Sequence, residues 1–258
     1  MGIKEKMVTM PLIKHPMLYF FMVMGFLSIL TTPILSFTSR PDLVLLVYLG
    51  LFLLFSVTVG FEEIGPFYNK SSGIINLIGM TGTVYITCIL VENLTGYFLA
   101  ANDPQLLDQY SYELSWQYVL NHFSRYCLVG IGEELFKFCV FLFVYWFGVK
   151  ISGKKLISCI ISVLLTSLLF GLLHVNYNYS QWLNITLIIG MSSVVYFYFL
   201  FKYQTILPLM IAHGLQDFIV SLELTQELEG IHFQFLMLLI GVWLISRFGF
   251  GMKIKMQR

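Results

Sequence analysis

The chain has 258 residues, of which 58% are hydrophobic and only 11% charged, and its formal net charge is +1. Soluble domains carry roughly one quarter charged residues, so this composition predicts an integral membrane protein with the lipid bilayer as its environment. The sequence contains no long basic block, which gives no indication of a nucleic-acid partner.

Apolar runs of about 17 residues or more, long enough to cross a bilayer, follow one another along the chain, and the fourth is overlong for a single span. They predict an all-α, polytopic membrane protein with about eight transmembrane helices. The runs cover residues 17–37, 43–60, 74–92, 118–148, 156–175, 182–201, 206–222 and 232–248. No repeat or soluble segment interrupts them, so residues 1–258 are expected to form a single helical membrane domain.

The basic residues between the runs predict the orientation, because cytoplasmic loops of membrane proteins are enriched in lysine and arginine. Eight spans would place the following residues on one side: Lys4, Lys6, Lys14, Lys70, Lys150, Lys154, Lys155, Lys202, Arg247, Lys253, Lys255 and Arg258. The other side receives Arg40 and acidic stretches around Asp103, Asp108 and Glu113. Both termini are therefore expected in the cytoplasm.

Ionisable residues inside the spans are unevenly distributed. An ionised side chain near the centre of a span costs about 2.5–3.5 kcal/mol on insertion scales, so such residues are rare and usually functional. The first three spans show none in their interiors, and Glu62 and Glu63 are interpreted as solvated residues at a span end. Chemistry is therefore expected in the second half of the chain.

The fourth span contains GIGEELFKF, with Glu133, Glu134 and Lys137 in an otherwise apolar run. On a helix Lys137 can reach either carboxylate, so one would be neutralised and the other left to act as a general base. Taken alone, the same residues could form a buried ion pair that holds helices together. Gly130 and Gly132 would let a neighbouring helix approach closely.

Two histidines lie in the fifth and seventh spans, each with a partner four residues away. Phe170 and His174 share a helix face in FGLLH, and His213 and Asp217 share one in HGLQD. The Asp217 carboxylate can accept a hydrogen bond from the His213 ring and set its tautomer. Each histidine by itself could equally be a hydrogen-bonded packing residue.

Together, these residues make a stronger case for chemistry than any one of them. They supply a base, a second proton carrier and donors for an oxyanion, which peptide-bond hydrolysis requires. The same groups could instead hold a zinc ion through Glu133, His174 and His213, with a position left open for water. The residues alone leave both alternatives open.

The ordered motifs EELFK, FGLLH and HGLQD resemble those of the CPBP superfamily of intramembrane proteases, also called the ABI family. The motif-bearing core covers about residues 118–222. The FGLLH motif is similar to the corresponding motif of the CAAX proteases in that family. The E-E-x-x-K pattern that ends at Lys137 and the H-x-x-x-D pattern that ends at Asp217 are PrsW-like.

The resemblance implies an intramembrane endopeptidase of the bacterial cell membrane that hydrolyses a peptide bond in a membrane-associated peptide or protein. The implied catalytic residues are Glu133, Glu134, His174, His213 and Asp217, with Lys137 and Phe170 supporting them. Glu133 would activate water with His174, and His213 would stabilise the oxyanion or, in the metalloprotease alternative, complete a site for zinc. The other alternative is a non-catalytic member of the fold, acting as a bacteriocin immunity factor or a regulator of a partner membrane protein.

The expected depths of these residues in the bilayer differ. Counting about 1.5 Å per residue from the cytoplasmic lysines, Glu133 and His174 lie at about 25–28 Å and His213 at about 16 Å. Helix tilt or a water-filled crevice must close this gap if the three residues form one site.

Overall fold

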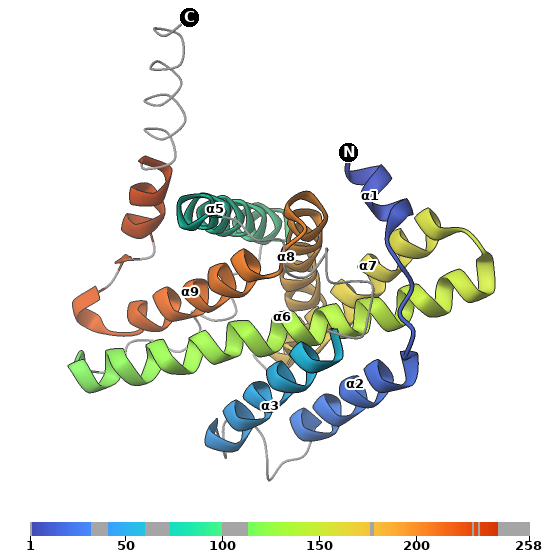
Figure 1. Ribbon diagram of the computed structural model, residues 1–258. Coiled ribbons are helices and arrows are strands. Elements are labelled where there is room, and N and C mark those ends of the chain that lie inside the picture. The colour runs from blue at the N-terminus through green and yellow to red at the C-terminus, as the bar shows by residue number, and fades with distance from the viewer. Residues whose placement is uncertain are drawn as a thin grey trace, which may run out of the picture.

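The computed structural model describes residues 2–31, 41–59, 73–99, 113–175, 178–228, 230–231 and 233–241. Its regular elements there are helices (Figure 1), which confirms the predicted all-α class. The α-helices are α1 (Ile3–Thr9), α2 (Pro16–Thr31), α3 (Pro41–Val59), α5 (Ile74–Leu99), α6 (Trp116–Ser152), α7 (Lys155–Leu172), α8 (Trp182–Tyr203) and α9 (Leu207–Glu223). Two short 3-10 helices are η4 (Tyr179–Gln181) and η5 (Gln226–Leu228), and residues 233–241 are also helical.

Within the described residues, three segments are long and apolar enough to cross a membrane: Ile74–Leu99, Lys155–Leu172 and Tyr179–Tyr203. Shorter apolar helices cover Pro16–Leu27 and Leu45–Val57. The chain is therefore a multi-pass membrane protein, while the number of eight spans stays a prediction. Several residues used to predict the orientation or to place an interface lie outside the described residues, namely Arg40, Glu62, Glu63, Lys70, Asp103, Asp108, Arg247, Lys253, Lys255 and Arg258.

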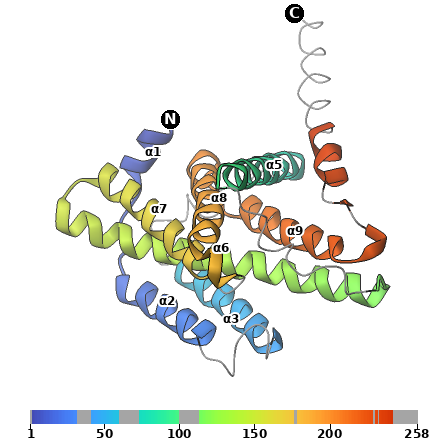
Figure 2. The same cartoon turned by 180° about the vertical axis from the view of Figure 1, so that it is seen from behind.

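The central element is α6, which is 37 residues long and so spans about 55 Å. It starts where the Ser115 hydroxyl accepts a hydrogen bond from the Tyr118 amide at 3.1 Å, and it ends at Gly153, whose φ of 67° suits glycine. Helices α2 and α3 pack on one side of α6, and α7 and α9 contact it elsewhere (Figures 1 and 2). Helix α5 lies against α8 and α9.

An aromatic row holds α8 against the second half of α6. Phe138, Phe141 and Tyr145 follow one another along α6 with near-parallel rings, and Phe141 also contacts Phe197 and Phe201 of α8 at centroid distances of 5.1 and 5.8 Å. Such aromatic contacts add to the burial of apolar surface. They anchor α8 beside the charged turn of α6.

Glycines bring α6 and α9 into direct backbone contact. A Cβ atom on Gly130 would lie 2.5 Å from the Gly214 amide nitrogen, and one on Gly214 would lie 2.6 Å from the Tyr126 carbonyl oxygen. Neither position has room for a side chain. The predicted close helix approach at Gly130 is therefore confirmed, and its partner is α9.

Replacing Gly214 by alanine is expected to destabilise the protein by about 1–3 kcal/mol, because the added methyl group forces two backbones apart. The unfolding temperature in detergent measures the effect. Gly79→Ala on α5 is the matched control, since a Cβ there meets nothing within 4 Å and alanine favours helix. Equal unfolding temperatures for the two variants would contradict the close contact.

Candidate functional site

The charged turn of α6 lies in the interior. Glu134 and Lys137 are 3% and 2% exposed, and the Lys137 ammonium forms an ion pair with Glu134 Oε1. The same ammonium lies 4.3 Å from the centroid of the Phe170 ring and 4.2 Å from that of Tyr196. One carboxylate and two aromatic faces thus compensate the lysine for its lost hydration.

His213 of α9 faces this turn across the glycine contact. Its Nδ1 atom is 2.7 Å from Glu134 Oε1, so the Nδ1–H group donates to that carboxylate. The sequence predicts Asp217 as the partner that sets the tautomer, but Asp217 Oδ2 lies 3.8 Å from His213 Nε2, beyond hydrogen-bond distance. Glu134 takes this role because α6 and α9 approach so closely.

The side chains of His174 and His213 both lie close to the Glu133 carboxylate. Its Oε2 atom is 3.5 Å from His213 Nε2 and 3.8 Å from His174 Nε2. His174 follows the end of α7, and its Nδ1 is 2.8 Å from the carbonyl oxygen of Phe170, which leaves Nε2 facing Glu133. Distances of this length are ones that a water molecule can bridge.

The structure thus brings the predicted site residues together and closes the depth gap expected from straight, parallel spans. Packing of α6 against α9 places His213 beside Glu133 despite their different distances from the cytoplasmic lysines. The packing of these two helices therefore accounts for the convergence. The side chains of Glu133 and His174 are partly exposed, at 16% and 14%, whereas that of Glu134 is 3% exposed.

The zinc alternative requires at least three ligating side chains around one point. Among the residues that the structure describes, no group of three or more His, Cys, Asp and Glu side chains is placed to hold a metal ion. The choice between a glutamate-type protease and a metalloprotease with Glu133, His174 and His213 as ligands stays a prediction.

Glu92 was missed by the sequence analysis. Because α5 continues to Leu99, Glu92 lies within the helix and not at its end, so the expectation of no ionisable residue inside the first three spans is wrong. The Gln216 side-chain amide of α9 donates to Glu92 Oε2 at 2.5 Å. The uncharged stretch NLTGYFL, which follows Glu92 as far as Leu99, was the signal that the span runs on.

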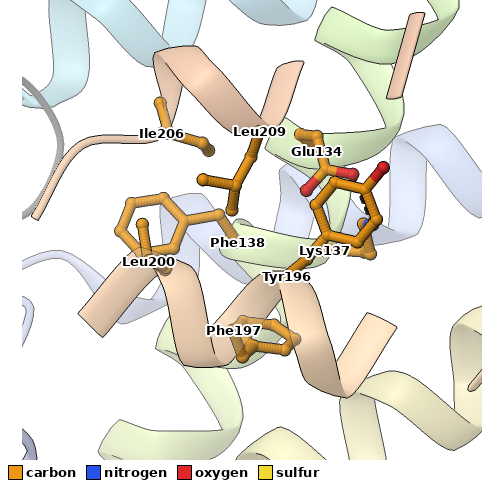
Figure 3. Close-up of a pocket in the computed structure, with 8 residues that line it drawn as sticks. All are labelled: Glu134, Lys137, Phe138, Tyr196, Phe197, Leu200, Ile206 and Leu209. Carbon is orange, nitrogen blue, oxygen red and sulfur yellow. Dashed lines mark ion pairs between the residues drawn. The ribbon is translucent and has the colours of Figure 1, made fainter. Parts of the chain in front are cut away.

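Tyr196 was also missed, since a tyrosine in an apolar span gives no signal of its own. It is 3% exposed, its ring lies 5.6 Å from that of His213, and its hydroxyl has no hydrogen-bond partner among the described residues. With Glu134 and Lys137 it forms the polar end of a small cavity (Figure 3). The apolar lining residues are Phe138, Phe197, Leu200, Ile206 and Leu209.

Comparison with known proteins gave one family. Residues 115–219 match the model described as "Type II CAAX prenyl endopeptidase Rce1-like". No curated protein and no solved structure matched the chain. The matched segment runs from the N-cap of α6 into α9 and contains the three motifs, whereas the PrsW-like features stay predictions. The predicted resemblance is thereby confirmed: residues 115–219 of this membrane protein match an Rce1-like model of the CPBP family of intramembrane proteases.

Proposed function

We propose that the protein is an intramembrane endopeptidase of the CAAX-protease type that hydrolyses a peptide bond in a membrane-associated peptide or protein. The observation that carries this proposal is the Glu133 carboxylate with two imidazole Nε2 atoms 3.5 and 3.8 Å away. It lies inside the segment that matches the protease family. The partial exposure of Glu133 gives water and substrate a way to reach it.

In the proposed reaction, Glu133 acts as the general base. A water held between Glu133 and His174 loses a proton to the Glu133 carboxylate and attacks the substrate carbonyl carbon. The tetrahedral intermediate then collapses, the C–N bond breaks, and the same proton passes from Glu133 to the leaving amine. The Phe170 carbonyl fixes the His174 ring with Nε2 toward this water.

The role assigned to His213 is to stabilise the oxyanion of the tetrahedral intermediate. Its Nδ1–H group donates to Glu134, and the Nε2 atom is directed to the space between Glu133 and Asp217. A doubly protonated ring, flanked by carboxylates at both nitrogens, presents Nε2–H to the developing negative charge. Lys137 holds Glu134 in place from the other side, and the Asp217 carboxylate, 3.8 Å from Nε2, stabilises the positive charge of the ring.

We also propose eight spans with both termini in the cytoplasm of a bacterial cell. The basic residues between the predicted spans support this orientation. Helix α6, at about 55 Å, exceeds the ~30 Å hydrocarbon core and is assigned as a tilted span. The site then lies within the membrane, and a substrate helix must be unwound before its carbonyl groups reach Glu133.

The full chain in vesicles, incubated with a farnesylated peptide that ends in a C-a-a-X box, tests this function by mass spectrometry of the products. Wild type is expected to cleave the peptide, and His174→Ala and His213→Ala to reduce the rate by about 10²–10⁴-fold. His122→Ala is the matched control, because His122 Nδ1 also contacts the carbonyl four residues before it, at 2.9 Å, but outside the site. Its activity is expected to equal that of wild type.

Two outcomes of this experiment would contradict the proposal. Full activity of both site variants at normal protein abundance would exclude the assigned residues. A wild-type protein that leaves the peptide intact would favour the non-catalytic immunity factor or regulator. A chelator added to the same assay separates the two protease types, and glutamate-type cleavage is expected to persist in its presence.

A further inference from the structure

The contact between Glu92 and Gln216 joins two helices that are far apart in sequence. Glu92 belongs to α5, outside the matched segment, and Gln216 to α9, inside it. The amide nitrogen of Gln216 lies 2.5 Å from Glu92 Oε2, and Gln216 is 7% exposed. A carboxylate within a membrane helix is rare, and it is usually retained for a function.

Gln216 occupies a decisive position on α9. It lies three residues after His213, which donates to Glu134, and immediately before Asp217. Gly214, in the same turn, contacts the backbone of α6. Helix α9 is therefore held by α6 on one side and by α5 on the other, as the arrangement of the helices shows (Figures 1 and 2).

These two attachments restrict different motions of α9. The glycine contact sets how closely α9 approaches α6, but two helices in contact at glycines can still turn about their own axes. A hydrogen bond from the side of α9 to a residue on a third helix restricts that turning. Since the His213 ring projects from α9, a small rotation would change its distance from Glu133, and misplacement by about 1 Å can reduce a rate by about 10²-fold.

We propose that Glu92 is a positioning residue: through Gln216 it fixes the rotation of α9 and thereby the distance between His213 Nε2 and Glu133. This inference rests on the proposed protease function for its effect on rate, but not for its effect on the position of His213. It assigns a part of the site to α5, which precedes the family match.

The kinetic test uses the vesicle assay with the farnesylated peptide. Glu92→Leu and Gln216→Leu are each expected to lower kcat by about 10- to 100-fold, with KM changed by less than about two-fold. Glu92→Gln keeps an acceptor oxygen and is expected to lose less. The exchanged pair, Glu92→Gln with Gln216→Glu, is expected to recover most of the kcat lost in Gln216→Leu. Asn93→Ala, at an exposed neighbour on α5, is the control.

A second measurement reports the chemical reactivity of the His213 ring in the absence of substrate. Diethylpyrocarbonate modifies imidazoles, and mass spectrometry of digested protein reports the extent at each histidine. In Glu92→Leu, modification of His213 is expected to rise several-fold relative to wild type, while His122 serves as the internal reference. Recovery of the wild-type extent in the exchanged pair would show that the hydrogen bond, and not the volume of the side chain, is responsible.

The outcomes separate the two proposals. If wild type cleaves no peptide but His213 becomes more reactive in Glu92→Leu, the proposed function fails and the positioning role stands. Unchanged kcat and unchanged His213 reactivity in both leucine variants would overturn the positioning role. Should Glu92→Leu not accumulate in membranes, Gln216→Leu and Glu92→Gln carry the same test.

Discussion

Replacing Glu133 by glutamine is expected to reduce peptide hydrolysis by about 10²–10⁴-fold, the contribution of a positioned general base. The amide has nearly the same shape as the carboxylate but cannot take a proton from water. The nearest imidazole nitrogens of His213 and His174 lie 3.5 and 3.8 Å from Glu133 Oε2, so the substitution removes no short ion pair. Protein abundance is expected to stay normal, and kcat/KM with the farnesylated peptide measures the loss.

The control for this substitution is Glu227→Gln in η5, an exposed glutamate outside the site. It makes the same chemical change and is expected to leave kcat/KM unaltered. In cells, a membrane peptide or protein that accumulates uncleaved only in Glu133→Gln would identify the natural substrate. A Glu133→Gln protein that turns over at the wild-type rate would remove Glu133 from the mechanism.

Replacing Lys137 by methionine is expected to destabilise the fold by about 3–5 kcal/mol, because it breaks the buried ion pair and leaves the Glu134 carboxylate with the His213 ring as its one remaining partner among the described residues. Glu134 is 3% exposed, so water cannot take the place of the ammonium. Methionine fills much of the same space between the Phe170 and Tyr196 rings, so the effect reports charge more than volume. Thermal unfolding in detergent, together with abundance in membranes, measures it.

Two further variants show how the unfolding temperature of Lys137→Met should be interpreted. Lys202→Met is the matched control, since Lys202 also lies over aromatic rings, 5.3 Å from the centroid of Phe199, but is exposed. Its effect is expected to stay below about 1 kcal/mol. Combining Lys137→Met with Glu134→Gln removes both charges and is expected to be less destabilised than Lys137→Met alone. Equal unfolding temperatures for Lys137→Met and Lys202→Met would show that the ion pair does not stabilise the fold.

The sequence predicted which residues share a helix face, because that depends on the helical repeat alone. The proximity of Glu134 to Lys137, and of His174 to Phe170, follows from spacings of three and four residues. The resemblance of the three ordered motifs to those of one family then predicted that these residues belong to a single site. The fourth span was predicted as overlong, and α6 is longer still.

Contacts between helices could not be read in the same way. His213 meets Glu134 and not Asp217 because α6 and α9 touch at Gly130 and Gly214, and no periodicity specifies which glycines of two helices will meet. Glu92 was overlooked because the end of an apolar run is a weaker signal than its centre. The number of spans depends also on segments outside the described residues, such as 60–72 and 242–258.

The backbone contact between Gly130 and Gly214 makes the geometry of the site depend on how many residues separate each site residue from these glycines. Glu133 follows Gly130 by three residues and His213 adjoins Gly214, so the contact sets how both side chains face each other. A one-residue insertion between Gly130 and Glu133 would turn the carboxylate by about 100° around α6. Relatives that retain hydrolysis are therefore expected to share the paired spacings G-x-x-E-E and H-G, even where their loops have diverged in length.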